Sequence, residues 1–268
     1  MSFSISGKTA IITGAANGIG LAIARHFVDK GANVMFADMD EARLEDEVGE
    51  EARSEGPVRM FAGDLRQKLT MANLLSATVD AFERIDILVN ASRQCGPSDA
   101  LDPERDLVEE LLEQNLLTSL RLSQMTAKRM IQKAEKAEAE GMIGSIVNLS
   151  SLAAVRTQPQ LLGYSISSAA VEQMTRSLAV ALAPRGIRVN AVSFGSVMSA
   201  SLQGALRENS DWRDRIERGT PLGRIASADE VAEAVHFLAS DASGFMTGQV
   251  LTLDGGRGLL DVVAAPSF

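Results

Sequence analysis

The sequence predicts an α/β fold in which a parallel sheet is covered by helices on both faces. Short apolar runs rich in β-branched residues alternate with longer segments of helical period from one end of the chain to the other. These runs are almost continuously apolar, which is typical of strands buried on both faces of a parallel sheet. Such repeated β-α units predict a single doubly wound domain of the Rossmann type, with right-handed crossovers.

Seven apolar runs are predicted as the strands: KTAIIT (8–13), NVMFAD (33–38), VRMFAG (58–63), DILVNA (86–91), GSIVNLS (144–150), IRVNAVS (187–193) and QVLTLD (249–254). Between them, helical patterns are predicted at about 18–30, 41–55, 70–84, 104–139, 162–183 and 228–240. The charged stretch QKAEKAEAEG (132–141) is rich in helix formers. We interpret it as a solvated extension of the preceding helix, with a partner-binding role as the alternative.

The composition is that of an ordinary globular protein, with 46% hydrophobic and 23% charged residues in a chain of 268. No repeat, Pro-rich linker or low-complexity tract divides the chain, so residues 1–268 are predicted to form one domain. The net charge of −9, without a dense basic run, argues against binding to nucleic acid or to an anionic membrane. Small-molecule partners are favoured.

The cysteine, the histidines and the N-terminal residues bear on the cellular location and on metal binding. A single cysteine, Cys95, cannot form an internal disulfide, which favours a reducing compartment; its thiol is either reactive or inert. The first twenty residues lack a basic region and an unbroken apolar run, so neither a signal peptide nor a membrane anchor is predicted, and a cytoplasmic location follows. His26 and His236 lie far apart in sequence with no Cys or His at ligand spacing, so no metal site is predicted.

The turn TGAANGIG at 13–20 follows the first predicted strand and opens the first helix. Gly14 allows a tight turn, Gly18 lets the backbone approach a pyrophosphate, and Gly20 permits close packing of helix on strand. The helix N-terminus would then offer unpaired N–H groups to an anion. The spacing is G-x-x-x-G-x-G, and by itself it also fits a plain βα turn.

Asp38 ends the second predicted strand, where a carboxylate can accept hydrogen bonds from both hydroxyls of an adenosine ribose. The same charge would repel a 2′-phosphate, and no Arg or Lys lies in the glycine-rich turn or at Met39 to hold one. NAD is therefore favoured over NADP, with an ordinary loop carboxylate as the alternative. Asp64, after the third strand, is a candidate for the adenine edge or for a helix N-cap.

Together with that turn, further stretches in order along the chain resemble the short-chain dehydrogenase/reductase family, and in particular its 3-oxoacyl-(acyl-carrier-protein) reductase-like members. The resemblance covers essentially the whole chain and rests on TGAANGIG (13–20), Asp64, DILVN (86–90), Asn115, GSIVNLSS (144–151), Tyr164, RGIRVNAV (185–192) and MTGQVLTLDGG (246–256). The family implies a seven-stranded parallel sheet and hydride transfer between a nicotinamide cofactor and a carbonyl or secondary alcohol.

The resemblance also implies roles for residues. Tyr164 would donate or accept the proton, Ser151 would polarise the substrate oxygen, and Asn115 would hold a water in the proton path. Taken alone, without the resemblance, Ser151 could equally cap a turn, and Asn115 could be an ordinary polar residue inside a helix. The implied cofactor contacts, besides Tyr164, are Gly14, Asn17, Gly18, Ile19, Gly20, Asp38, Asp64, Leu65, Asn90, Ala91, Val197 and Ser199.

The chain departs from the family beside the tyrosine. Members carry a lysine four residues after it, whereas this chain has Ser168. Residues four apart share a helix face, and a cation beside a phenol typically lowers its pKa by about 1–3 units, so losing it could cost about ten to a thousandfold in rate. Arg93 replaces the last residue of the family's NNAG, at the carboxyl end of the fourth strand. We hypothesise that its guanidinium partly replaces the lysine; a solvated side chain or a phosphate contact is the alternative.

Two functions stay open. The chain is either a working NAD-dependent oxidoreductase or an NAD-binding but impaired or silent member that acts as a sensor or assembly subunit. Segment 194–227 falls where the family builds its substrate lid, and its apolar Met198, Leu202, Leu206 and Trp212 suggest a substrate with hydrophobic parts or ordinary packing. The resemblance also implies a tetramer or dimer formed through the helices at about 104–139 and 162–183.

Overall fold

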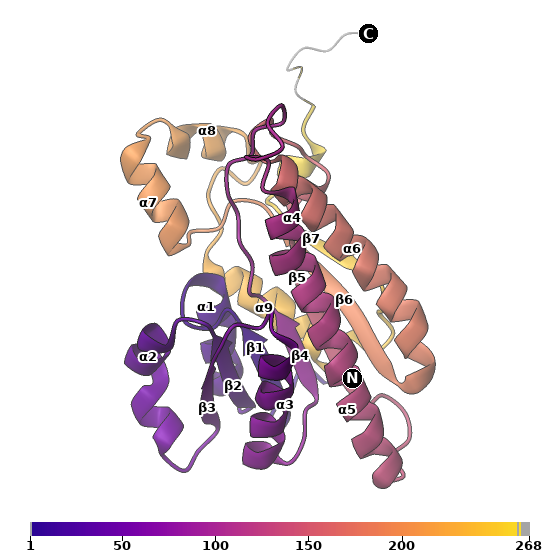
Figure 1. Ribbon diagram of the computed structural model, residues 1–268. Helices are drawn as coiled ribbons and strands as arrows, with labels where there is room; N and C mark the ends of the chain where they lie inside the picture. The colour runs from indigo at the N-terminus through magenta and orange to yellow at the C-terminus, as the bar shows by residue number, and fades with distance from the viewer. Residues whose placement is uncertain (1, 262, 264–268) are drawn as a thin grey trace.

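Seven parallel strands form one sheet at the centre of the chain, as a computed structural model describes it for residues 2–261 and 263 (Figure 1). The spatial order of the strands is β3-β2-β1-β4-β5-β6-β7. Their bounds are β1 Thr9–Thr13, β2 Asn33–Asp38, β3 Val58–Ala62, β4 Ile87–Asn90, β5 Gly144–Ser151, β6 Ile187–Phe194 and β7 Val250–Leu253. The order reverses between β1 and β4, and in sheets of this kind ligands bind at the carboxyl edge of the strands next to such a reversal. The predicted Rossmann-type α/β domain is confirmed.

Helices cover both faces of the sheet. The helices with bounds are α1 Gly18–Asp29, α2 Glu41–Arg53, α3 Lys68–Phe82, α4 Val108–Leu111, α5 Thr118–Lys136, α6 Leu162–Leu182, α7 Ala200–Glu208, α8 Trp212–Arg218 and α9 Ala228–Ala239. Short 3₁₀ turns occupy Leu152–Ala154, Ala183–Arg185, Asp241–Ser243 and Arg257–Leu259. One apolar core gathers side chains from α1, α2 and α9, and the other gathers side chains from α3, α5 and α6.

The alternation of strand side chains explains why the strands are apolar throughout. Ile12 packs in the core beneath α1 and α9, whereas its neighbour Ile11 packs in the core beneath α3 and α5. Both side chains are fully buried. Because both faces of the sheet are covered by helices, the strands carry apolar residues at nearly every position and do not alternate between apolar and polar ones. These continuous apolar runs mark the strands clearly in the sequence, and the predicted strands differ from the observed ones by one or two residues at most.

The prediction of one long helix at 104–139 is wrong in its detail. The observed helical region begins at Val108, is interrupted by a π-helical stretch, η1, over Leu112–Leu117, and ends at Lys136. The predicted solvated extension at 132–141 is thus helical only as far as Lys136, and Gly141 already lies in the left-handed region at φ 84°. Segment 194–227 contains the two helices α7 and α8, which stand out beside the sheet in Figure 1.

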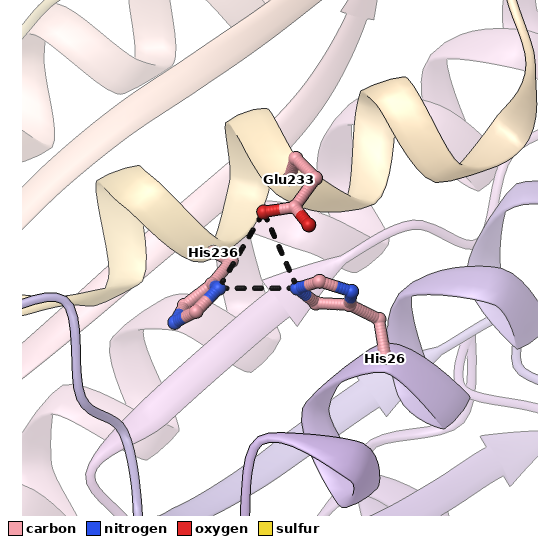
Figure 2. Close-up of side chains that lie close together, drawn as sticks. All are labelled: His26, Glu233 and His236. Atoms are coloured by element: carbon pink, nitrogen blue, oxygen red, sulfur yellow. Dashed lines mark hydrogen bonds and ion pairs between the residues drawn. The ribbon is translucent and has the colours of Figure 1, made fainter.

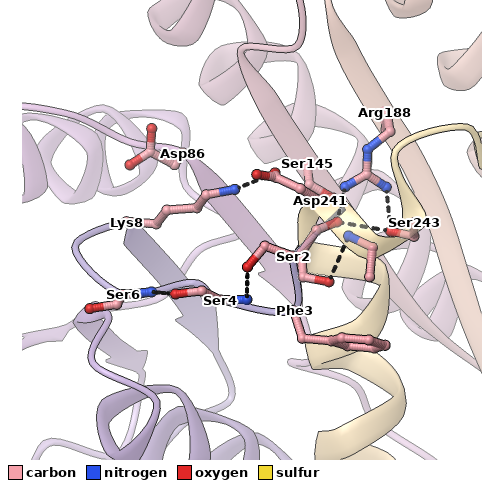
Figure 3. Close-up of polar contacts among 12 residues, drawn as sticks. Ser2, Phe3, Ser4, Ser6, Lys8, Asp86, Ser145, Arg188, Asp241 and Ser243 are labelled. Carbon is pink, nitrogen blue, oxygen red and sulfur yellow. Dashed lines mark hydrogen bonds and ion pairs between the residues drawn. The ribbon is translucent and has the colours of Figure 1, made fainter.

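The opposite edge of the sheet, where the strands begin, is tied together by polar contacts (Figure 3). Lys8 pairs with Asp241 at 2.6 Å. The buried Arg188 guanidinium donates to the backbone carbonyl groups of Leu238 and Ser240, just where α9 ends, and to the Ser243 hydroxyl. A cation at this end complements the helix dipole and satisfies carbonyl groups that have no partner within the helix.

Across residues 2–261 and 263, no helix combines the length and the apolar character needed to cross a bilayer.

Candidate active site

The glycine-rich turn has the geometry that its sequence predicts. Gly14 and Gly18 lie in the left-handed region, at φ 68° and 55°. A Cβ on Gly20 would overlap the carbonyl oxygen of Gly14 and lie 2.7 Å from its carbonyl carbon, so only glycine lets α1 approach the turn so closely. A Cβ on Gly18 would meet nothing within 4 Å, which leaves open space over the turn.

The N-terminus of α1 is suited to an anion. Asn17 is the N-cap residue, but its side chain makes no capping hydrogen bond, and the first turn contains no acidic residue. The buried Ile19 anchors this end in the core. Unpaired N–H groups at the positive end of the helix dipole attract phosphate, so the residues present fit a pyrophosphate group.

Asp38 lies beside this turn at the end of β2. Its carboxylate accepts hydrogen bonds from the backbone N–H groups of Ala16, at 3.0 Å, and Asp40, at 3.1 Å. The two bonds hold the carboxylate at the carboxyl edge of the sheet, and the side chain stays partly exposed. A partly exposed carboxylate next to a phosphate-binding turn fits a ribose with free hydroxyls.

Asp64 follows β3 but does not cap a helix, because α3 begins at Lys68 with Gln67 as its N-cap residue. Its carboxylate instead pairs with Arg66 at 2.8 Å, and the hydrogen bond from this guanidinium lowers the pKa of Asp64. Leu65 is buried. Of the two possibilities for Asp64, the N-cap is therefore wrong.

Asn90 and Ala91 join the end of β4 to its neighbours. The Asn90 amide donates to the Ser123 hydroxyl at 2.9 Å and to the Asn148 side-chain oxygen at 2.8 Å. The Ala91 N–H donates to the Thr13 hydroxyl at 3.0 Å. These buried contacts fix the start of the loop that carries Arg93.

Ser151 and Tyr164 line one cleft of about 670 Å³ at the carboxyl edge of the sheet. Ser151 is the last residue of β5, and its hydroxyl accepts the Ala153 N–H at 3.2 Å, so it caps the following turn as well as facing the cleft. Tyr164 comes from the first turn of α6 and is 6% exposed. Two hydroxyl-bearing residues that are thirteen apart in the sequence thus line one cleft.

Arg93 contacts the tyrosine directly. Its Nη1 donates a hydrogen bond to the Tyr164 hydroxyl oxygen, and its guanidinium carbon lies 4.3 Å from the centre of the Phe194 ring. Ser168, one turn along α6 from Tyr164, is 5% exposed. Arg93, Tyr164 and Ser168 line the same small cavity of about 10 Å³. The side chain is therefore not simply solvated: it places a cation at the hydroxyl group, beside the position of the missing lysine.

Asn115 holds the loop that carries Arg93. Its side-chain oxygen accepts the Gln94 N–H at 2.8 Å, and its amide donates to the Gln94 carbonyl at 2.9 Å and to the Ser167 hydroxyl at 3.1 Å. Gln114 donates to the Ser92 hydroxyl at 3.2 Å. Asn115 lies in the π-helical stretch, and such stretches are frequent at functional sites. Protein groups thus occupy its side-chain oxygen and amide, and its implied role in holding a water stays a prediction.

Val197 and Ser199 follow β6 at the base of segment 194–227. Val197 is buried and forms a backbone bridge with Ala226. The Ser199 hydroxyl accepts the Leu202 N–H at 3.3 Å and caps α7. Among the described residues, those lining the cleft of Ser151 and Tyr164 do not include the predicted apolar lid residues Met198, Leu202, Leu206 and Trp212.

One cluster of side chains was not predicted from the sequence. His26 from α1 and His236 from α9 meet with their ring nitrogens 3.0 Å apart, together with Glu233. The two histidines are far apart in the sequence, but they come together because α1 and α9 pack against each other on one face of the sheet. Only the Glu-x-x-His spacing at 233–236 hinted at a shared helix face.

The chain is similar to known proteins along most of its length. The profile of the family described as Enoyl-(Acyl carrier protein) reductase matches residues 14–257. The chain is 36% identical to L-fucose dehydrogenase of Mus musculus over 95% of this chain and 89% of that protein. It is 33% identical to the 3-oxoacyl-(acyl-carrier-protein) reductase FabG of Thermotoga maritima over 94% and 98%, respectively.

The fold is shared with a solved structure at similar identity. The crystal structure of gox2181 superposes with a TM-score of 0.87 and 30% identity, covering 96% of this chain and 98% of that one. With the glycine-rich turn, the cleft and the seven-stranded sheet, these similarities show that the chain belongs to the short-chain dehydrogenase/reductase family of oxidoreductases.

Proposed function

We propose that this chain is an NAD(H)-dependent oxidoreductase that interconverts a secondary alcohol and a carbonyl compound, and that Arg93 supplies the cation that activates Tyr164. The observation that carries this proposal is the hydrogen bond from the Arg93 guanidinium to the Tyr164 hydroxyl, since Tyr164 also lines the cleft that contains Ser151. A cation that donates a hydrogen bond to this oxygen can stabilise negative charge that develops there during proton transfer.

The cofactor site would be built from the carboxyl ends of the strands. NAD supplies the hydride acceptor when bound, and NADH the donor. We propose that the glycine-rich turn and the N-terminus of α1 hold the phosphates and that Asp38 holds the adenosine ribose. The other residues proposed to contact the cofactor are Asp64, Leu65, Asn90, Ala91, Tyr164, Val197 and Ser199. Because the side chain of Asn90 is bonded to Ser123 and Asn148, we expect its contact to come through the backbone.

In the oxidation direction, the substrate hydroxyl would lie between Ser151 and Tyr164. Ser151 donates a hydrogen bond to the substrate oxygen and orients it, and the phenolate of Tyr164 takes the hydroxyl proton as the C–H bond breaks. The reverse reaction returns that proton to the oxygen, where negative charge develops. Arg93 stabilises the phenolate throughout, and Asn115 positions Arg93 through the backbone of Gln94.

We propose a polyhydroxylated substrate. The polar side chains that line the cleft, among apolar ones such as Leu152, Val155 and Leu161, include Arg156, Thr157, Gln158, Ser196 and Arg257. Arg156 donates to the Gly258 carbonyl and Arg257 to the Ser196 hydroxyl, so Thr157 and Gln158 are the groups on which recognition of a hydroxyl-rich molecule would depend. Hydrogen-bonding groups in a cleft recognise hydroxyl-rich molecules and disfavour apolar ones, whose binding leaves these groups unpaired. The similarity to an L-fucose dehydrogenase supports a sugar or polyol as the substrate.

The direct test is turnover. We expect the purified chain to form NADH from NAD and at least one secondary alcohol from a panel of sugars and polyols that includes L-fucose. NAD binding is measured in parallel by calorimetry. Binding of NAD without turnover of any substrate, in either direction, would favour the second function below.

The second candidate is an NAD-binding protein that is catalytically silent and acts as a sensor or assembly subunit, and the observation that favours it is Ser168 in place of lysine. Replacing Ser168 by lysine separates the two. If Arg93 already activates Tyr164, S168K changes kcat by less than about tenfold, since the charge is present. If the chain is silent, S168K creates activity where none exists. Ser177→Lys, on the exposed face of the same helix, is the matched control.

Replacing Asp38 by serine tests the cofactor preference. We expect D38S to raise the kcat/KM ratio of NADP to NAD by about 10–100-fold, because the repulsion of a 2′-phosphate is removed along with a ribose contact; this corresponds to about 1.4–2.7 kcal/mol. Asp46→Ser removes the same charge from the exposed face of α2 and should leave the ratio unchanged. An unchanged ratio in D38S would contradict the assignment of Asp38 to the ribose.

A further inference from the structure

Two histidines and a glutamate converge on one point between α1 and α9 (Figure 2). The Nε2 atom of His26 lies 3.0 Å from the Nδ1 atom of His236. One Glu233 carboxylate oxygen lies 3.7 Å from the first nitrogen and 3.9 Å from the second. Each side chain thus aims one metal-binding atom at the same small volume.

The spacing suits a tetrahedral ion. Bonds of about 2.0–2.2 Å from Zn²⁺ to imidazole nitrogen or carboxylate oxygen place neighbouring ligand atoms about 3.3–3.6 Å apart. The three observed separations, 3.0, 3.7 and 3.9 Å, bracket that range. Changes of about half an ångström or less in each separation would bring all three into that range.

The proton arrangement also suits a metal. The Nε2 atom of His236 lies 2.7 Å from the Phe3 carbonyl oxygen, and since a carbonyl only accepts, we assign the proton to this nitrogen. The Nδ1 atom then presents its lone pair to the cluster. A metal-binding histidine commonly donates its other N–H to a backbone carbonyl in this way.

The surroundings of the cluster combine a buried side with an open one. The side chains of His26 and His236 are 14% and 8% exposed, whereas that of Glu233 is 63% exposed. The Phe27 ring lies within 6.4 Å of both imidazole rings, measured between ring centres. An ion can therefore enter from the side of Glu233 and find the two nitrogen ligands already held in place.

We propose that His26, Glu233 and His236 form a site for a divalent transition metal with the ligand preference of Zn²⁺, with a fourth position left for water. Two imidazole groups and one carboxylate are a donor set that Zn²⁺ prefers and that Mg²⁺ and Ca²⁺ do not. His26 lies eight residues along α1 from Gly18, about 12 Å at 1.5 Å per residue, so the site is remote from the proposed cofactor turn. The ion would link α1, α9 and, through His236, the segment at Phe3, and thereby stabilise the fold.

The test is metal binding by the metal-free protein in a Cys95→Ser background, which removes an exposed thiol that could bind the metal by itself. With Co²⁺ as the probe, we expect visible d–d absorption bands that saturate at one ion per chain. With Zn²⁺, we expect one ion per chain by calorimetry and a rise in Tm.

Variants identify the ligands. His26→Gln should weaken Zn²⁺ binding by at least about 100-fold, since loss of an outer partner alone costs 10–100-fold. Glu233→Gln, at an exposed position, should weaken it by at least about tenfold, because a neutral amide replaces the carboxylate ligand. Asp229→Asn removes an exposed carboxylate from the same helix and should bind as the parent does. The proposal fails if the parent shows no saturable binding, or if His26→Gln and Glu233→Gln both bind Zn²⁺ as tightly as the parent, because the two histidines then form only a hydrogen-bonded pair.

Discussion

Replacing Arg93 by leucine is expected to lower kcat about 100-fold, within a range of about 10–1000-fold, while leaving NAD affinity within a few-fold of the parent. The guanidinium donates to the Tyr164 hydroxyl, and Ser168 offers no charge to replace it. Arg93→Lys should retain part of the rate, because it keeps the charge but loses the planar donor group that lies over Phe194. Steady-state kinetics on the best substrate measures both.

A double-mutant cycle shows whether Arg93 acts through the tyrosine. Tyr164→Phe removes the proton donor and should lower kcat by about 10²–10⁴-fold. In that background, Arg93→Leu should cause little further loss, since there is no hydroxyl left to activate. Equal losses from Arg93→Leu with and without Tyr164 would mean that Arg93 serves cofactor or substrate binding instead. Restoration of Arg93→Leu by Ser168→Lys would show that the two positions supply the same charge.

Replacing Gly20 by alanine is expected to give the largest loss of stability, about 3 kcal/mol or more, together with a loss of NAD affinity of at least about tenfold. The added Cβ would overlap the carbonyl oxygen of Gly14, so α1 must move away from the turn that it positions. Urea denaturation gives the free energy of unfolding, and calorimetry gives the Kd of NAD.

Gly204 provides the matched control for this substitution. It lies within α7, and a Cβ there would meet nothing within 4 Å. Gly204→Ala should therefore leave NAD binding unchanged and stabilise the protein slightly, by up to about 1 kcal/mol, because alanine favours the helix. If Gly20→Ala were as stable as Gly204→Ala, the close approach of α1 to the turn would not be a determinant of the fold.

Local patterns were sufficient to predict the sheet but not the π-helical stretch. Runs such as NVMFAD are apolar because both faces of the sheet are covered, and β2 has the predicted bounds, Asn33–Asp38. The helical period around Asn115 carries no mark of the extra residue per turn at Leu112–Leu117. We attribute that irregularity to contacts between segments, since the Asn115 side chain is bonded to Gln94 and Ser167.

The site was predictable where residues follow a strand and unpredictable where segments meet through packing. Arg93 could be proposed as a substitute for lysine because the end of β4 lies at the ligand-binding edge. That Asn115 holds the backbone of Gln94, and that His26 meets His236 from 210 positions away, depends on how the helices pack. No pattern within one helix encodes a partner on another.

The cation beside Tyr164 stands on the loop after β4, whereas the lysine of relatives would stand on α6. If Arg93 activates Tyr164 as proposed, two separate segments of this fold can supply the same charge. A chain with both an arginine at 93 and a lysine at 168 would then tolerate the loss of either one, because the other still places a cation at the tyrosine hydroxyl.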